Sequence, residues 1–210
     1  MSRLKFIFDL DGTLIDSAET IISALRIAII QHHVKPLVNI DESLIGPSLR
    51  QIIIKLLGPN EISKTELVES SFKFHYDETE FKRARPYMGV SDLLGLMQKN
   101  AYELFIATNK RQNPTNKIIN FLKWNDYFKN VYGLEGPLPA KNKTELIRSI
   151  LMVENLNPED VYYIGDRVED YEAASENKIR FVHAEWGYGT IKNVEAIKNP
   201  LELWTIIDSN

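Results

Sequence analysis

The sequence has no cysteine, no long hydrophobic run and no excess of positive charge. Without cysteine the chain cannot form disulfides or use a thiolate as a metal ligand or nucleophile, which suits a reducing compartment. The longest apolar run, residues 21–30, contains Arg26 and is too short to cross a bilayer. The net charge of −4 argues against nucleic acid as the main partner. A strand-like segment begins almost at Met1, so we expect no signal peptide, no membrane partner and a cytoplasmic location.

Short apolar runs alternate with helical patterns over most of the chain. The apolar runs cover residues 5–8, 103–107, 130–132, 161–164 and 180–183. The helical patterns that separate them cover about 90–99, 114–122, 143–153 and 169–176. Strands that alternate with helices favour right-handed crossovers and a parallel sheet. The predicted fold class is therefore α/β, with a doubly wound, Rossmann-like core.

One stretch, residues 17–83, breaks this alternation because it contains helical patterns and no convincing strand. Its three predicted helices cover residues 18–33, about 47–57 and about 64–81. Pro86 ends the basic segment that returns to the core. We therefore predict an all-helical cap that is inserted after the first strand. The expected boundaries are residues 16–85 for the cap and residues 1–15 and 86–210 for the core.

Two carboxylates directly follow the first apolar run, in Phe8-Asp9-Leu10-Asp11-Gly12-Thr13-Leu14. In open α/β sheets the carboxyl edge of the strands is where ligands bind. Acids this close repel each other unless a positive charge lies near them, and Mg²⁺ suits carboxylate oxygens together with a substrate phosphate. An Asp-Gly pair alone is a common turn. The specific signal is the whole string after a buried strand.

This string resembles the first motif of the haloacid dehalogenase superfamily of hydrolases, which have a doubly wound core with a helical cap. The family's second motif, a Ser or Thr at the end of the second core strand, is similar to Thr108 with Asn109. Its third motif is a Lys near a helix start. Lys143 fits better than Lys141, because many relatives place this Lys before a small residue, an acid and two apolar residues.

The fourth motif of that family, Gly-Asp-x-x-x-Asp, is similar to the segment from Gly165 to Asp170. Asp166 and Asp170 are its two acids. A structural alternative is that Asp166 caps the following helix and Asp170 stands in the first turn, where it satisfies the helix dipole. The segment Trp186 to Gly189 resembles a loop of phosphoglycolate-phosphatase-like members and is expected at the rim of the site.

The resemblance implies a magnesium-dependent phosphatase. Asp9 would attack phosphorus and form an aspartyl-phosphate, while Asp11 would serve as general acid and then as general base. Asp9, the backbone carbonyl of Asp11, and Asp166 would hold Mg²⁺, and Asp170 would orient water or Lys143. The residues expected to bind the phosphoryl group are Gly12, Thr108, Asn109 and Lys143.

A Gly-Pro turn begins the second predicted cap helix, in Gly46-Pro47-Ser48-Leu49-Arg50. Similar loops in relatives point at the active site, and a helix N-terminus offers free N–H groups to an anion. Arg50 would add a contact if it faces the site; otherwise it is a solvated side chain. The expected substrate and partner is therefore a small phosphorylated metabolite, phosphoglycolate or a nucleoside monophosphate, with Pro47, Ser48 and Arg50 as candidate specificity residues.

Three alternative functions can be weighed on single residues. Dehalogenases lack the second acid, which is present as Asp11. A phosphomutase similar to beta-phosphoglucomutase would need a cap His where this chain has Ile21. A non-catalytic regulatory or binding protein would usually lose one of the acids, and none is lost. The chain itself is expected to be a monomer or a homodimer.

Overall fold

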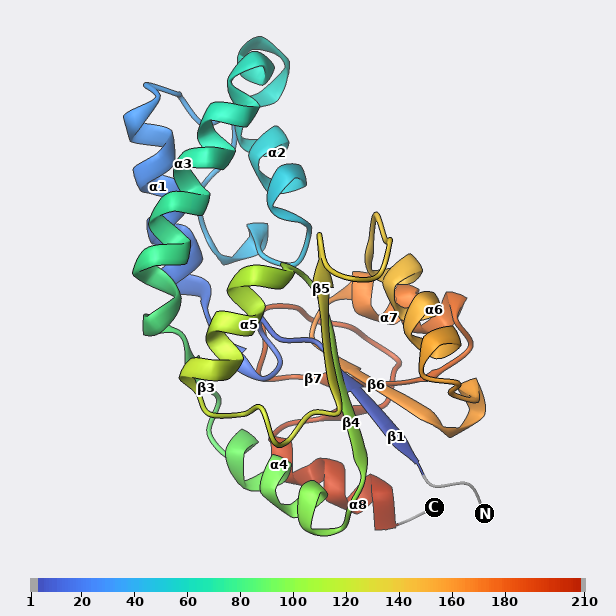
Figure 1. Ribbon diagram of the computed structural model, residues 1–210. Coiled ribbons are helices and arrows are strands. Elements are labelled where there is room, and N and C mark those ends of the chain that lie inside the picture. Colours follow the sequence, from blue (N-terminus) through green and yellow to red (C-terminus); the bar gives the residue numbers. More distant parts are fainter. Residues whose placement is uncertain (1–3, 209–210) are drawn as a thin grey trace.

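A sheet of six parallel strands, in the order β5-β4-β1-β6-β7-β8, forms the centre of the protein (Figure 1). The structure is a computed structural model, in which residues 4–208 are described. The strands are β1 (Lys5–Phe8), β4 (Glu103–Arg111), β5 (Asn130–Leu134), β6 (Val161–Gly165), β7 (Arg180–Ala184) and β8 (Ala196–Ile197). The predicted fold class is confirmed. The two-residue strand β8 was not expected, because so short a segment carries no readable periodicity.

Helices cover both faces of this sheet. They are α4 (Val90–Lys99), α5 (Gln112–Phe121), α6 (Lys143–Val153), α7 (Val168–Glu176) and α8 (Leu203–Asp208), with 3₁₀ turns η4 (Pro158–Asp160) and η5 (Pro200–Glu202). Successive strand residues point to opposite faces. Ile7 of β1 accordingly packs in one cluster with Leu146 of α6 and Ala173 of α7. Phe8 packs in the other cluster, with Leu94 of α4.

Three helices form a separate layer beside the sheet (Figure 1). They are α1 (Ala18–Gln31), α2 (Leu49–Glu61) and α3 (Thr65–Glu78), with 3₁₀ turns η1 (Glu42–Leu44), η2 (Ile62–Lys64) and η3 (Glu80–Arg83). No strand occurs between residues 17 and 84, as the sequence predicts. The chain leaves and returns through the antiparallel pair β2 (Ile15–Asp16) and β3 (Arg85–Pro86). We propose this pair as the boundary of the cap at residues 16–85; core residues 1–3 and 209–210 lie outside the described residues.

The cap helices differ from the sequence prediction mainly at their ends. The first ends at Gln31, and the third ends at Glu78 and continues as a 3₁₀ turn. The second begins at Leu49 with Ser48 as N-cap. It is interrupted at Gly58, whose φ of +63° is non-helical, and one further turn follows Pro59. No helix within residues 4–208 is long and apolar enough to cross a membrane.

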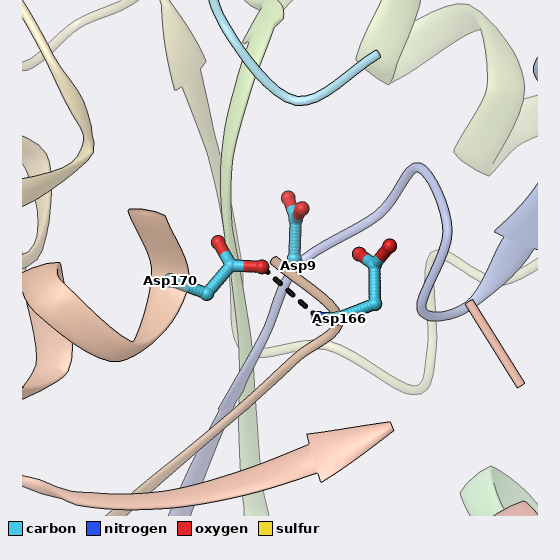
Figure 2. A group of neighbouring side chains, drawn as sticks. All are labelled: Asp9, Asp166 and Asp170. Atoms are coloured by element: carbon cyan, nitrogen blue, oxygen red, sulfur yellow. Dashed lines mark hydrogen bonds between the residues drawn. The ribbon is translucent and has the colours of Figure 1, made fainter. Parts of the chain in front are cut away.

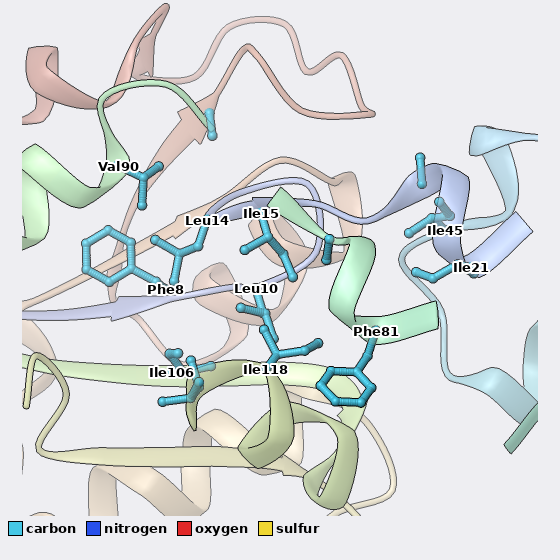
Figure 3. Packing of buried hydrophobic residues seen from close by; sticks show 14 of the residues in the cluster. Phe8, Leu10, Leu14, Ile15, Ile21, Ile45, Phe81, Val90, Ile106 and Ile118 are labelled. Carbon is cyan, nitrogen blue, oxygen red and sulfur yellow. The ribbon is translucent and has the colours of Figure 1, made fainter. Parts of the chain in front are cut away.

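One apolar cluster joins the sheet, the loop after β1 and the cap. Figure 3 shows Leu10 and Leu14 of that loop packed between Phe8 and Ile106 of the sheet and neighbouring helices. Ile21 and Ile45 of the cap belong to the same cluster. Burying such a side chain stabilises the fold by about 1.5–3 kcal/mol, so these contacts hold the cap against the edge where β1 ends.

Candidate active site

The Asp9 side chain lies at the carboxyl edge of the sheet, directly after the inner strand β1 (Figure 2). It is buried, and its Oδ2 is 2.9 Å from Lys143 Nζ. Its Oδ1 is buried without a hydrogen-bond partner among the described residues. Burial raises the pKa of Asp9 to about 6, although the nearby Lys143 ammonium opposes the rise. One oxygen of this carboxylate is therefore free for a ligand or for reaction.

Asp166 follows β6 and is fully buried beside Asp9 (Figure 2). Its Oδ1 accepts a hydrogen bond from Thr13 Oγ1 (3.3 Å), and its Oδ2 accepts one from the backbone N–H of Tyr188 (2.8 Å). Burial, together with the charges of Asp170 and Asp9, raises the pKa of Asp166 to about 7. The N-cap of the next helix, α7, is Arg167. The alternative in which Asp166 caps that helix is therefore wrong.

Asp170 stands in the first turn of α7, and both of its oxygens are occupied by protein donors. Its Oδ2 accepts hydrogen bonds from the backbone N–H groups of Asp166 and Arg167, each at 3.0 Å; Figure 2 marks the first of these. Its Oδ1 pairs with Lys143 Nζ. Asp170 thus anchors the β6–α7 turn and the lysine, whereas Asp9 keeps a free oxygen.

The structure brings Lys143, and not Lys141, to the site. Lys143 is the first residue of α6, a helix start that Asn142 fixes by accepting a hydrogen bond from the Glu145 N–H (2.9 Å). Its side chain is buried against Asp9 and Asp170. Burial alone would lower the pKa of Lys143, but the two carboxylates outweigh it and raise the pKa above its ordinary value. Lys141 is exposed, two residues before this position.

Asp11 is held by a different set of groups. Ser17 Oγ donates to its Oδ1 (2.6 Å), and Lys110 Nζ lies 3.1 Å from Oδ1 and 2.9 Å from Oδ2. Lys110 Nζ also lies 4.6 Å from the centre of the Tyr76 ring, which belongs to cap helix α3. Burial alone would lower the pKa of Lys110. The Asp11 carboxylate and Tyr76 outweigh this effect and raise the pKa above its ordinary value. Sequence reasoning missed Lys110, although it directly follows Thr108 and Asn109.

The residues expected to bind the phosphoryl group lie around Asp9, but the side-chain N–H of Asn109 points to the cap. Gly12 has a φ of +86°, and a Cβ there would lie 2.4 Å from Asp166 Oδ2, so no other residue fits. Thr108 is buried and lines the cavity over Asp9. The Asn109 amide N–H donates to the Gly46 carbonyl of the cap (2.8 Å), so this donor is turned to the cap.

Core and cap enclose a cavity of about 540 Å³ of empty space, part of it open to solvent, above Asp9 and Asp11. Pro47 lines this cavity; Ser48 and Arg50 do not. Ser48 Oγ donates to Gln51 Oε1 (2.9 Å) at the helix start. Arg50 is exposed and pairs with Glu69 of α3 (3.1 Å), and neither residue lines the cavity. The structure does not bring Arg50 to the site.

The loop after β7 contacts the turn after β1 and Asp166. Trp186 Nε1 donates to the Thr13 carbonyl (2.9 Å), and Tyr188 donates to Asp166 as described above. A Cβ on Gly187 would lie 2.2 Å from the Cβ of Asp166, so glycine allows this close approach. The loop therefore packs directly on an acid of the site, at the rim that the sequence suggested.

The three buried acids Asp9, Asp166 and Asp170 each offer a ligand atom, and these atoms lie within 4.8 Å of one another. Lys143 neutralises one of the three charges, and Arg167 Nε reaches Asp166 only at 3.9 Å. The cluster therefore keeps an excess of negative charge in a buried place, which a bound cation would relieve. Carboxylate oxygens with one unpartnered atom, Asp9 Oδ1, suit a hard divalent cation.

Comparison with known proteins identifies the family. The family described as haloacid dehalogenase-like hydrolase matches residues 6–184. The chain is 30% identical to a 5′-nucleotidase of Pseudomonas aeruginosa over 193 residues, covering 91% of this chain and 87% of that protein. A phosphoglycolate phosphatase of Aquifex aeolicus is 28% identical over 184 residues, covering 87% and 84%. A haloacid dehalogenase-like hydrolase of Streptococcus pneumoniae has a TM-score of 0.84 at 26% identity, covering 98% of both chains.

The chain therefore belongs to the haloacid dehalogenase-like hydrolase family. The resemblance that the sequence motifs suggested is confirmed, and so is the prediction that the protein is an enzyme.

Proposed function

We propose that this hydrolase is a magnesium-dependent phosphatase that cleaves small phosphomonoesters through an aspartyl-phosphate on Asp9. The observation that carries the proposal is the Asp9 carboxylate, which is buried at the sheet edge with one oxygen free and the other held by Lys143. Relatives named 5′-nucleotidase and phosphoglycolate phosphatase support it, since both names describe phosphomonoester hydrolysis. Phosphoglycolate and nucleoside monophosphates are the substrates that these names suggest.

In the proposed reaction Asp9 attacks phosphorus while the bond to the leaving oxygen breaks. Asp11, which starts the cycle protonated, gives its proton to that oxygen, so the alcohol leaves uncharged. Water then attacks the phosphorus of the aspartyl-phosphate, and Asp11 takes a proton from it as the bond to Asp9 breaks. Ser17 and Lys110 keep the Asp11 carboxylate in place by direct contacts.

Asp9, Asp166 and the backbone carbonyl of Asp11 would hold Mg²⁺. When bound, the ion neutralises charge on the phosphoryl oxygens. Asp170 is a poorer ligand, because two backbone N–H groups and Lys143 already occupy its oxygens. We propose that Asp170 positions Lys143, whose ammonium stabilises the phosphoryl group.

Four residues would contact the phosphoryl group itself, namely Gly12, Thr108, Asn109 and Lys143. Thr108 lines the cavity and the Lys143 ammonium lies beside Asp9. The Asn109 donor would have to leave the Gly46 carbonyl, so its contribution depends on the position of the cap. Ile21 supports a phosphatase over a mutase, because it places an apolar side chain in the cavity where the mutase-like pattern has a cap His.

A phosphate-release assay tests the proposal. The purified protein is offered phenyl phosphate, 2-hydroxyethyl phosphate and nucleoside monophosphates, with Mg²⁺ or with a chelator. We expect turnover only with the metal, and a loss on the order of 10⁴-fold or more in Asp9→Asn. The exposed Asp126→Asn is the matched control and should keep full activity. Full turnover in Asp9→Asn would exclude the proposed nucleophile. The small phosphorylated partner, the cytoplasmic location and the monomeric or dimeric state stay predictions.

A further inference from the structure

The cap covers the cavity over Asp9 with apolar groups. Ile21 of α1, Ile52 of α2, and Phe72 and Tyr76 of α3 line it from this side. Phe72 and Tyr76 stack on each other, with ring centres 5.3 Å apart. Among residues 4–208, the cap contributes no charged side chain to the lining. The part of the substrate that reaches past the phosphoryl group therefore meets aliphatic and aromatic surface.

The cations that line this cavity, Lys110 and Arg111, are already committed to protein carboxylates. Lys110 Nζ contacts both oxygens of Asp11. The Arg111 guanidinium forms a two-bond ion pair with Asp77 of α3, at 3.0 and 2.6 Å. Bidentate pairs of this kind are the stronger ones, so they resist exchange with a ligand. Neither cation is free to receive a second anionic group of the substrate.

The other side-chain cation beside Asp9, Lys143, belongs to the phosphoryl end, and the N-terminus of α2, where Gly46, Pro47 and Leu49 line the cavity, carries only a partial positive charge. Lys143 is buried between Asp9 and Asp170, below the cavity. A carboxylate on the leaving group would therefore lose its water without gaining a cation. Besides Asp9, two residues that line the cavity have a buried polar atom without a hydrogen-bond partner among the described residues, Asn109 Oδ1 and the Tyr76 hydroxyl. Asn109 Oδ1 only accepts hydrogen bonds, so it suits a hydroxyl or amino donor, whereas the uncharged Tyr76 hydroxyl can donate or accept.

We propose that the cavity selects an uncharged leaving group with an apolar or aromatic face and a hydrogen-bond donor, as in a nucleoside or an aryl alcohol, and selects against a carboxylate such as glycolate. This inference rests on the proposed phosphatase function. It narrows the substrate class that the relatives leave open, and it does so from the charges and surfaces of this chain alone.

Matched substrate pairs test the inference on the unaltered protein. The first pair is 2-hydroxyethyl phosphate and phosphoglycolate, which differ by a hydroxymethyl group in place of the carboxylate. The second is phenyl phosphate and 4-carboxyphenyl phosphate. We expect kcat/KM to be lower for the carboxylate member of each pair, on the order of a hundredfold. Equal or faster hydrolysis of phosphoglycolate would overturn the inference. Comparing kcat/KM for nucleoside monophosphates and aryl phosphates then shows whether the preferred leaving group is a nucleoside or an aryl alcohol.

Cap variants locate the selection in the apolar lining. Phe72→Leu should lower kcat/KM about tenfold for phenyl phosphate and nucleoside monophosphates, and much less for 2-hydroxyethyl phosphate. Phe74→Leu is the matched control, because Phe74 lies on the same helix and is 68% exposed. If Phe72→Leu fails to fold, Ile52→Ala takes its place, with the 41% exposed Ile54→Ala as its control. Equal losses on all substrates, or equal effects of variant and control, would overturn the role of the lining.

Binding separates this inference from the proposed function. If no phosphomonoester is hydrolysed with Mg²⁺, the phosphatase proposal fails. The cavity is then tested by calorimetry with three non-hydrolysable ligands: phenylphosphonate, 2-hydroxyethylphosphonate and phosphonoacetate. Binding of the two ligands without a carboxylate that is tighter than binding of phosphonoacetate, by about tenfold or more, supports the inference. Tighter binding of phosphonoacetate overturns it, whatever the enzyme assay shows.

Discussion

Replacing Lys143 by methionine removes the ammonium that lies between Asp9 and Asp170 and keeps an unbranched side chain of similar length. Removing one partner of a buried ion pair costs about 3–5 kcal/mol, because the other charge stays buried without compensation. In a protein of this size each kcal/mol shifts Tm by about 2–4 °C. We therefore expect the Tm of Lys143→Met to fall by roughly 6–20 °C at pH 8 without metal.

The fall in Tm of Lys143→Met should be smaller at low pH, because Asp9 can take up a proton there and no longer leaves an uncompensated buried charge. In the wild type the folded-state pKa of Asp9 is about 6, above the unfolded value. Between the two values the folded protein binds a proton at Asp9 that the unfolded chain has released, so the contribution of Asp9 to stability falls as the pH rises toward 6 and levels off above it. Without Lys143 the pKa of Asp9 rises further, and this window extends above pH 6. The lysine itself, whose pKa is raised, stays charged throughout.

The measurement is thermal unfolding of wild type and Lys143→Met at pH 5 and pH 8 in chelator, together with phosphate release in Mg²⁺. We expect a larger Tm difference at pH 8 and a loss of about 10²–10³ in kcat. Adding Asp170→Asn to Lys143→Met should recover part of the stability and none of the activity. Lys141→Met is the control and should change stability by no more than about 0.5 kcal/mol. An unchanged Tm and kcat in Lys143→Met would refute the reasoning.

Three further predictions concern the metal, the turn and the second acid. Adding Mg²⁺ at pH 8 should raise the Tm of the wild type, because the ion binds only the folded acids, and Asp166→Ala should abolish both this rise and the turnover; a rise that persists would move the metal elsewhere. Gly12→Ala should lower Tm and kcat together, because its φ is +86° and a Cβ would meet Asp166 Oδ2 at 2.4 Å; unchanged kinetics would show that the turn can relax. Lys110→Met should lower kcat more than it changes KM, because Lys110 holds Asp11; the exposed Lys99→Met is its control, and equal kinetics in both would remove Lys110 from the mechanism.

The parts of the fold that the sequence predicts best are those with a local physical cause. The predicted limits of α4 and α6 agree with the structure, because each helix follows a clear apolar pattern and α6 begins at the capping residue Asn142. The acids of the site were found because each follows a short buried strand, where the chain must reach the carboxyl edge of a parallel sheet. Asp9 after β1 and Asp166 after β6 are the examples.

What the sequence could not predict depends on contacts between distant segments. The pair of Arg111 and Asp77 joins residues 34 positions apart across core and cap, and no local pattern marks it. The sequence could not predict whether the Arg50 side chain faces the site, for the same reason. Its ion-pair partner, Glu69, lies on another helix. Lys110 resembles any polar residue after a strand until Asp11 and Tyr76 are placed beside it. Charge partners of this kind follow from the packing of helices, which a single sequence does not encode locally.

The two acids of the first motif stand two residues apart and yet have different surroundings, which fits two different roles. Asp9 is buried in the core with one oxygen free, and burial raises its pKa to about 6. Asp11 is instead held by Ser17, the N-cap of cap helix α1, and by Lys110, whose ammonium lies over the ring of Tyr76 on cap helix α3. The contacts that position Asp9, the proposed nucleophile, therefore come from the core, whereas Asp11, the proposed acid, is held partly by the cap. Moving the cap away from the sheet would disturb the Ser17 contact of Asp11 and the Tyr76 contact of Lys110, and leave the contacts of Asp9 intact. If Asp11 is the proton donor that we propose, its proton transfer is therefore coupled to the arrangement in which the cap excludes water.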